Sequence, residues 1–189
     1  EKGGRGAAWF VLGPFGDAVL RHYRRGGWAA KISHARYFWR EEASVRSIHE
    51  FRFMQNLCEK NLPVPKPVAA MYSRSGLFYS AAILIERIQA SRSFLDCVHA
   101  QTESAPWAEL GKCIARFHKV GARHADLNAQ NILLDPDNKI WLIDWDRAGL
   151  QAKPGSWCID VLQRLQRSLL KYRGEVDEET IMAGMQILR

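Results

Sequence analysis

The first residues of the chain show the short runs of aromatic and branched side chains that favour β-strands. Two such runs, at 8–12 and 18–23, flank the turn signal GPFG at 13–16. This order predicts a β-hairpin. A second turn signal, RRGG at 24–27, precedes WAAKI at 28–32, which is a further candidate strand.

The pattern changes to a helical period between residues 42 and 60. Apolar residues recur there at intervals of three and four positions, which places them on one side of an α-helix. These residues are Val45, Ile48, Phe51, Met54, Leu57 and Cys58. The same helix carries one acid of interest, Glu50. The prolines of LPVPKPV (62–68) end the helix and favour an extended chain after it.

Two further strands are expected after these prolines. AMYS at 70–73 and the apolar run at 78–88 flank the turn RSG at 74–76. The second run is almost continuous in apolar residues, so it is expected to be a central, buried strand. A small antiparallel sheet with one packed helix therefore accounts for the first half of the chain.

The second half is predicted to be mainly helical. Helical periods occur at 106–120, 158–172 and 178–188. Between the first two helices, the β-like runs at 131–135 and 139–144 flank the turn signal PDN.

Composition limits the class of protein without identifying its function. A chain of 189 residues with 47% hydrophobic content can bury a sizeable core. Its apolar runs fall short of the roughly 20 residues that span a bilayer. The four cysteines lack the spacing of a zinc site and are expected to be buried, reduced thiols of a cytosolic protein. The absence of an initiator Met and the opening EKGGRG suggest that the sequence begins within a longer polypeptide.

The net charge of +7 indicates an anionic partner. Nucleic acid, acidic lipid headgroups and phosphorylated small molecules all satisfy this condition. No nucleic-acid-binding signature occurs in the sequence, so nucleic acid is not expected to be the partner.

The segment HADLNAQNILLD (124–135) carries the chemistry. An acid in this loop, Asp126, can accept a proton from a hydroxyl group. The amide of Asn131 and the acid Asp144, which ends the next strand, are oxygen ligands of the kind that Mg²⁺ prefers. Together they predict phosphoryl transfer, with the alternative that these residues are turn acids and a capping Asn.

This pattern resembles the protein-kinase superfamily. HADLNAQN fits the H-x-D-x-x-x-x-N catalytic loop, and IDWD (143–146) stands where kinases carry D-F-G. The resemblance implies a two-lobed α+β fold, with an N-terminal lobe at 1–88 and a mainly helical C-terminal lobe at 89–189. It also implies that Asp126 is the catalytic base and that Asn131 and Asp144 hold magnesium against the phosphates of ATP.

A closer resemblance is to the 3-deoxy-D-manno-octulosonic acid (Kdo) kinases of Gram-negative bacteria. It rests on GRGAAWF, LRHYRRGG, RSIHEF, LPVPKP, HADLNAQNILLD and LIDWDR, which follow one another along nearly the whole chain. In that family, ATP phosphorylates the 4-OH of Kdo on a lipid A precursor during lipopolysaccharide core assembly. The resemblance implies a peripheral protein at the cytoplasmic face of the inner membrane, in contact with its anionic surface.

The kinase resemblance also indicates an ATP site in the first half. Gly4 and Gly6 would form a glycine-rich loop that approaches phosphate, although the third spaced glycine of the kinase motif is absent. Kinases place a Lys on their third strand. Here that strand offers Arg21, and Lys31 is a second candidate. Glu50 is the expected partner of either cation.

The segment from Glu86 to Ile88 is expected to be the hinge, whose backbone would meet adenine. For the acidic groups of the acceptor, the candidate contacts are Arg123, Arg147, Arg164, Arg167 and Lys171, each of which is alternatively an ordinary surface charge. Two other functions stay open. The chain could phosphorylate another acceptor, such as a heptose, an aminoglycoside-like molecule or a protein. It could also be a pseudokinase that binds nucleotide without turnover.

Overall fold

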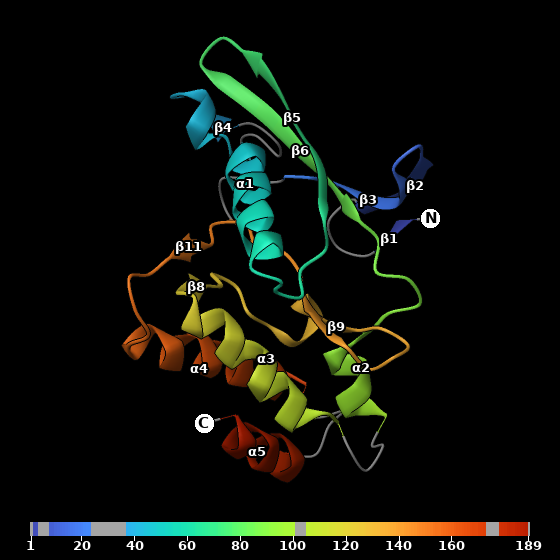
Figure 1. Ribbon diagram of the computed structural model, residues 1–189, viewed down its shortest axis with the longest axis vertical. Coiled ribbons are helices and arrows are strands. Elements are labelled where there is room, and N and C mark those ends of the chain that lie inside the picture. The colour runs from blue at the N-terminus through green and yellow to red at the C-terminus, as the bar shows by residue number, and fades with distance from the viewer. Residues whose placement is uncertain (1, 4–7, 24–36, 101–104, 173–177, 189) are drawn as a thin grey trace. The chain divides into compact units, whose positions relative to one another are not determined.

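The computed structural model describes residues 2–3, 8–23, 37–100, 105–172 and 178–188 (Figure 1). By its internal contacts the chain divides into two compact units. The first comprises Glu1–Lys60 and Pro65–Arg87, and the second comprises Asn61–Val64 and Ile88–Arg189. The chain therefore passes for the last time from the first unit to the second between Arg87 and Ile88.

An antiparallel sheet forms the framework of the first unit. Its strands are β1 (Lys2–Gly3), β2 (Ala8–Gly13), β3 (Gly16–His22), β4 (Tyr37–Phe38), β5 (Pro67–Ser75) and β6 (Phe78–Glu86). The order β1-β2-β3-β6 crosses the sheet, and β4 and β5 also pair with β6 (Figure 1). The segment from Ala81 to Ile85 of β6 is buried, so the prediction of a central apolar strand is confirmed. The candidate strand at 28–32 lies outside the described residues.

Helix α1 (Arg46–Glu59) packs against β5 and β6 and follows a short 3₁₀ turn, η2 (Glu42–Ser44). Its predicted apolar stripe is partly wrong. Met54 and Leu57 are buried, but the same buried face also carries the polar residues Ser47 and Glu50. Both polar side chains are hydrogen-bonded. The Ser47 hydroxyl donates to the Met71 carbonyl at 3.0 Å, and Glu50 accepts from Arg21 at 2.5 Å. These bonds offset the cost of burying polar groups.

The second unit contains most of the helices. They are α2 (Phe94–His99), α3 (Trp107–Lys119), α4 (Ser156–Leu170), α5 (Glu178–Ile187) and the 3₁₀ turn η3 (Ala129–Asn131). Its strands are β7 (Arg92–Ser93), β8 (Ala122–Arg123), β9 (Ile132–Leu134), β10 (Ile140–Leu142) and β11 (Gly149–Leu150). They form the sheets β10-β9-β7 and β11-β8. The three helices and the hairpin predicted for this half are present, whereas α2, β7, β8 and β11 were not predicted.

Large side chains fill the core of the second unit. Trp145 is fully buried and stacks on Phe117, with ring centroids 5.0 Å apart. Helix α5 packs against α3 and α4, and Gly184 permits close approach because a Cβ there would lie 2.1 Å from the Trp107 ring. Gly121 is also required, since its φ of +75° and the nearby Gln151 carbonyl leave no room for a side chain. The Gln151 amide donates to the Gly121 carbonyl at 2.8 Å, next to the pair of β8 and β11.

The segment 61–64 joins the second unit through its carbonyl groups. Arg116 donates to the Asn61 carbonyl at 2.6 Å, and the Leu142 amide donates to the Pro63 carbonyl at 3.0 Å. A proline-rich stretch can accept such bonds although its prolines cannot donate. The end of the hairpin β9–β10 is thereby tied to the chain that follows α1.

The cysteines are free thiols, as expected, but only Cys97 and Cys113 are buried, while Cys58 and Cys158 are half-buried. Burial raises the pKa of the Cys113 thiol to about 12, so this group stays protonated and unreactive at neutral pH. In the part of the chain that the structure describes, no helix has the length and apolar character needed to cross a bilayer.

Candidate active site

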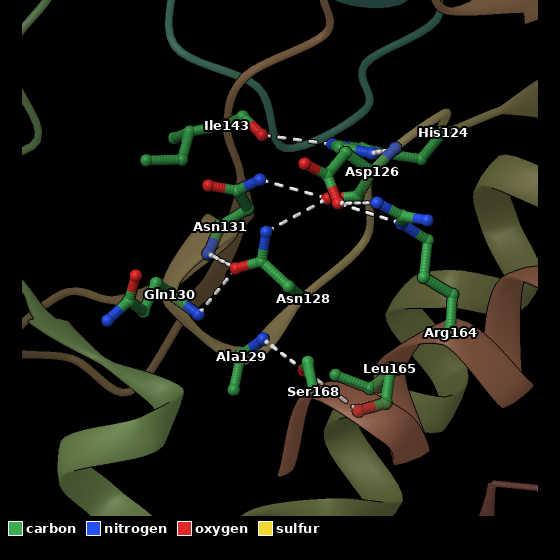
Figure 2. Close-up of polar contacts among 10 residues, drawn as sticks. All are labelled: His124, Asp126, Asn128, Ala129, Gln130, Asn131, Ile143, Arg164, Leu165 and Ser168. Atoms are coloured by element: carbon green, nitrogen blue, oxygen red, sulfur yellow. Dashed lines mark hydrogen bonds and ion pairs between the residues drawn. The ribbon is translucent and has the colours of Figure 1, made fainter. Parts of the chain in front are cut away.

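The loop predicted to be catalytic lies between β8 and β9 in the second unit (Figure 2). It begins at His124 and ends in the turn η3, whose first residue follows Asn128. The side chain of Asn128 caps this turn, because its Oδ1 accepts from the amides of Gln130 and Asn131 at 3.0 and 3.1 Å. The loop therefore has a defined shape that depends on its own sequence.

His124 links this loop to the end of β10. Its Nε2 lies 2.9 Å from the Ile143 carbonyl, and its Nδ1 lies 3.1 Å from the Asp126 amide. A carbonyl accepts and an amide donates, so the imidazole is neutral, with its proton on Nε2. Burial lowers the pKa of His124 from its ordinary 6.5, although the Ile143 carbonyl and the charges of Asp144 and Asp126 act in the opposite direction. Both acids therefore lie close enough to His124 to act on its charge.

We expect this arrangement to make stability depend on pH. The lowered pKa keeps His124 neutral in the native state, while the unfolded chain binds a proton below pH 6.5. The contribution is thus complete above that pH and is lost as the pH falls toward the native pKa. Urea denaturation at several pH values from 7.5 downward would measure the decline, which should be smaller in His124→Gln because the amide does not titrate. An equal decline in both proteins would contradict this role of His124.

The main chain of Asp126 is held from two sides. The Asn131 Nδ2 donates to the Asp126 carbonyl at 2.9 Å, and the Asn128 Nδ2 donates to the same carbonyl at 3.2 Å (Figure 2). The Asp126 amide donates to His124, as described above. The backbone of the predicted base is therefore fixed without using its carboxylate, and that side chain is 52% exposed.

Asp144 follows a strand end that is bound to the same loop. The Ile143 amide donates to the Asn131 carbonyl at 3.0 Å. Asp144 itself adopts a left-handed backbone conformation, with a φ of 63°, which Asp tolerates better than most residues. The next residue, Trp145, is fully buried and stabilises this bend, since its indole N–H donates to the Leu142 carbonyl at 3.0 Å. Such backbone strain is frequent at functional sites.

The donor groups present fit a magnesium ion. The Asn131 amide uses its nitrogen to bind Asp126, which leaves its oxygen available, and within the described residues no hydrogen bond reaches that oxygen. Asp144 supplies a carboxylate. Among the described residues there is no cluster of three or more His, Cys, Asp or Glu side chains that could hold a metal. Magnesium does not need one, because it is commonly bound by one or two carboxylates, water and substrate phosphates.

A second group of charged residues lies in the first unit. Arg21 on β3 donates through its Nη2 to both carboxylate oxygens of Glu50, at 2.5 and 2.6 Å. The hydroxyl of Tyr23 also donates to Glu50. The Glu50 side chain is 1% exposed and the Arg21 side chain 24% exposed, so part of the arginine side chain reaches solvent. The acid that the sequence singled out on the helix is therefore bonded to Arg21, one of the two cations predicted to be its partner.

Of the other residues predicted to contact the nucleotide, the structure describes only Glu86 and Ile88. Gly4, Gly6 and the alternative cation Lys31 lie outside the described residues. The strands on either side of the glycines, β1 and β2, pair antiparallel. The amide of Glu86 donates to the Lys66 carbonyl at 2.8 Å, and the Ile88 carbonyl accepts from Ser91.

Comparison with known proteins identifies the family of this chain. The chain matches the lipopolysaccharide kinase (Kdo/WaaP) family over residues 1–184. It belongs to this family. A relative from Stenotrophomonas maltophilia, named 3-deoxy-D-manno-octulosonic acid kinase, is 53% identical over 188 residues, which span 100% of this chain and 76% of the relative.

Two further relatives carry the same name. The protein from Xylella fastidiosa is 48% identical over 189 residues, covering 100% of this chain and 76% of its own length. The protein from Xanthomonas campestris pv. campestris is 50% identical over 181 residues, covering 96% of this chain and 73% of its own length. The predicted α+β class and the family resemblance are both confirmed, and membership of a kinase family implies the use of ATP.

Tyr23 and Asn128 were not identified as candidate functional residues from the sequence. Tyr23 shares Glu50 with Arg21, and Asn128 supports both the turn and the Asp126 carbonyl. The spacing of Asn128 before an apolar run is a capping signal that sequence reasoning could have used. Arg164, one of several basic candidates, binds Asp126 through its Nε at 2.7 Å.

Proposed function

We propose that the chain transfers the γ-phosphoryl group of ATP to the 4-OH of Kdo on a lipid A precursor. The structural feature that carries this proposal is the bond from the Asn131 amide to the Asp126 carbonyl at 2.9 Å, which joins the predicted base to a predicted metal ligand. The names of the relatives support Kdo as the acceptor. The proposed site residues are Asp126 as base, with Asn131 and Asp144 as ligands of magnesium.

In this reaction, Asp126 takes the proton of the acceptor hydroxyl, whose oxygen then forms a bond to the γ-phosphorus while the bond to the ADP oxygen breaks. Asn131 and Asp144 would hold magnesium, which, when bound, neutralises charge on the phosphates. The shape of the loop and of the end of β10 is stabilised by the hydrogen bonds of His124, Asn128 and Trp145. None of these three is required to touch the acceptor.

The nucleotide is proposed to bind through the first unit and the segment that follows it. Arg21 would contact the phosphates while Glu50 and Tyr23 hold its guanidinium in place. Gly4 and Gly6 would approach the phosphates through their amides, with Lys31 as a second cation. The backbone of Glu86 and Ile88 would meet adenine, through groups other than the Glu86 amide, which donates to the Lys66 carbonyl. The pseudokinase alternative was based on the missing strand lysine, and the Arg21–Glu50 pair weakens that argument.

The acceptor can be tested with labelled ATP. We expect phosphate to appear on a Kdo-bearing lipid A precursor, and not on the same precursor without Kdo, because the transferred group needs the sugar hydroxyl. A heptose-bearing acceptor and an aminoglycoside serve as comparison substrates. Transfer to one of these with none to the Kdo-bearing lipid would reject the proposed acceptor while leaving the kinase chemistry intact.

We also propose that the protein acts at the cytoplasmic face of the inner membrane, bound peripherally to its anionic surface. The net charge of +7 supports attraction to acidic lipid. Around the β5–β6 turn the first unit exposes large apolar side chains, namely Phe38, Met71, Tyr72, Leu77 and Phe78. Sedimentation with phosphatidylglycerol vesicles, compared with neutral phosphatidylcholine vesicles, tests this location. Equal or absent binding to both would contradict it.

A further inference from the structure

One face of helix α4 is directed at the catalytic loop. Arg164, Ser168 and Tyr172 are spaced by four positions, which places them along one side of a helix and the turn after it. The Ala129 amide donates to the Ser168 hydroxyl at 3.1 Å, and the Gln130 Nε2 donates to the Tyr172 hydroxyl at 3.2 Å. Arg164 differs from these two residues, because it binds the carboxylate of Asp126 itself (Figure 2).

The contact between Arg164 and Asp126 is not needed to build the loop. Three hydrogen bonds already fix the main chain of Asp126, whose amide donates to His124 and whose carbonyl accepts from Asn128 and Asn131. The two charged side chains are 47% and 52% exposed, and an ion pair of that exposure adds little to stability. Stability of the loop therefore does not account for the contact of Arg164 with the Asp126 carboxylate.

The ion pair uses only some of the polar atoms of its two side chains. The Nε and Nη2 of Arg164 lie 2.7 and 2.6 Å from one carboxylate oxygen of Asp126, Oδ1. Among the described residues, no hydrogen bond reaches the other oxygen, Oδ2, or the Nη1 group of Arg164. Oδ2 can therefore accept a hydrogen bond from a hydroxyl group, and Nη1, which carries two N–H donors, is available to an anionic group of the same molecule.

The proposed acceptor has the matching chemistry. Kdo is a sugar acid, and its carboxylate is ionised at neutral pH. Arginine binds carboxylates through charge-assisted hydrogen bonds and keeps its charge in all ordinary conditions. A neutral hexose offers the hydroxyl but not the anion.

We propose that Arg164 binds the carboxylate of the sugar-acid acceptor while a hydroxyl of the same sugar donates to Asp126. The inference rests on the proposed function and adds to it the residue that selects an acid over a neutral sugar. The phosphate groups of a lipid A precursor are also anions, so the experiment must separate them from the sugar carboxylate.

The test compares acceptors and variants in one assay. The acceptors are the Kdo-bearing lipid A precursor, its carboxyl methyl ester and its dephosphorylated form. We expect the wild-type protein to prefer the acid over the ester by about 10- to 100-fold in kcat/KM, the range of a hydrogen bond to a charged group. Arg164→Ala should lose this factor on the acid, through the KM for the acceptor, and change little on the ester. Arg164→Lys should retain part of the preference.

Controls separate this role from a structural one. Lys119→Ala removes one positive charge from the exposed surface of α3 in the same unit and should match the wild type on every acceptor. Thermal melting shows whether Arg164→Ala is folded. If this variant is unfolded, the comparison of acid and ester is made with Arg164→Lys instead. A loss of equal size on acid and ester would overturn the proposal, because Arg164 would then only position Asp126. The proposal would also be overturned if the effect of Arg164→Ala on kcat/KM disappeared with the dephosphorylated acceptor, because Arg164 would then bind the phosphates.

Measuring the binding of the acceptor without turnover tests the carboxylate site separately from the proposed reaction. Calorimetric titration of the wild type and Arg164→Ala with the acid and the ester gives the same comparison as a ratio of Kd values. If no phosphate is transferred but the wild type still prefers the acid and Arg164→Ala does not, the reaction is wrong and the carboxylate site stands. If phosphate is transferred without any preference, the carboxylate site is wrong.

Discussion

Replacing Asp126 with Asn is expected to lower kcat by about 10²- to 10⁴-fold, the usual contribution of a general base. The amide has the same shape as the carboxylate but cannot take the proton of the acceptor hydroxyl. The hydrogen bonds of the Asp126 main chain with His124, Asn128 and Asn131 do not involve the carboxylate and should persist. Single-turnover assays with labelled ATP measure the loss, and calorimetry should find ATP binding close to that of the wild type.

A matched control is available in the same unit. Asp137 lies exposed in the turn between β9 and β10, and Asp137→Asn makes the same chemical change away from the loop. It should leave kcat close to the wild-type value. Retention of more than about a tenth of the activity in Asp126→Asn would contradict the assignment of the base, since even the weakest effect of this kind is about 10²-fold.

Removing the guanidinium of Arg21 is expected to affect both activity and stability. Arg21→Met should lower kcat/KM for ATP by about 10²-fold if the proposal is correct, because the cation proposed to contact the phosphates is lost. It should also lower the free energy of unfolding by about 3 kcal/mol, because Glu50 is 1% exposed and loses a charged partner. Steady-state kinetics and urea denaturation measure the two effects.

The two effects of Arg21 can be separated by a second substitution. In Arg21→Met with Glu50→Gln, the buried charge is gone and the amide oxygen still accepts from the Tyr23 hydroxyl. Stability should largely return while activity stays low. Arg52→Met, on the exposed side of α1, removes an arginine without such a contact and serves as the control. If the double variant regains activity together with stability, Arg21 has only a structural role.

Much of the fold could be read from residue order. The periods of three and four residues located α1, α3, α4 and α5, and the turn signals located the hairpins β2–β3, β5–β6 and β9–β10. Each of these elements is long enough, or close enough in sequence to its partner, for local pattern to dominate. The buried face of α1 was only partly predicted, since Ser47 and Glu50 are buried through bonds to other elements.

The elements that were missed are two-residue strands, the three-residue turn η3 and one six-residue helix. Ser93 of β7 pairs with Leu133, and Arg123 of β8 pairs with Gly149, so each strand exists only because a distant segment supplies its partner. Helix α2 has six residues and begins with the side chain of Ser93 capping the Asp96 amide. Segments this short contain too few residues for a period to be recognised.

The sequence by itself determined the chemical groups at the loop, because the acid at 126 and the amide at 131 lie within one short segment whose turn is capped by Asn128. It could not show that Arg21 would meet Glu50, and Lys31, the alternative cation, lies outside the described residues. It also could not single out Arg164 among several surface cations. The tertiary structure joined Arg21 to Glu50 across 29 positions and Arg164 to Asp126 across 38. Contacts over such separations depend on how strands and helices pack, and local patterns of residues carry no information about which distant side chains will meet.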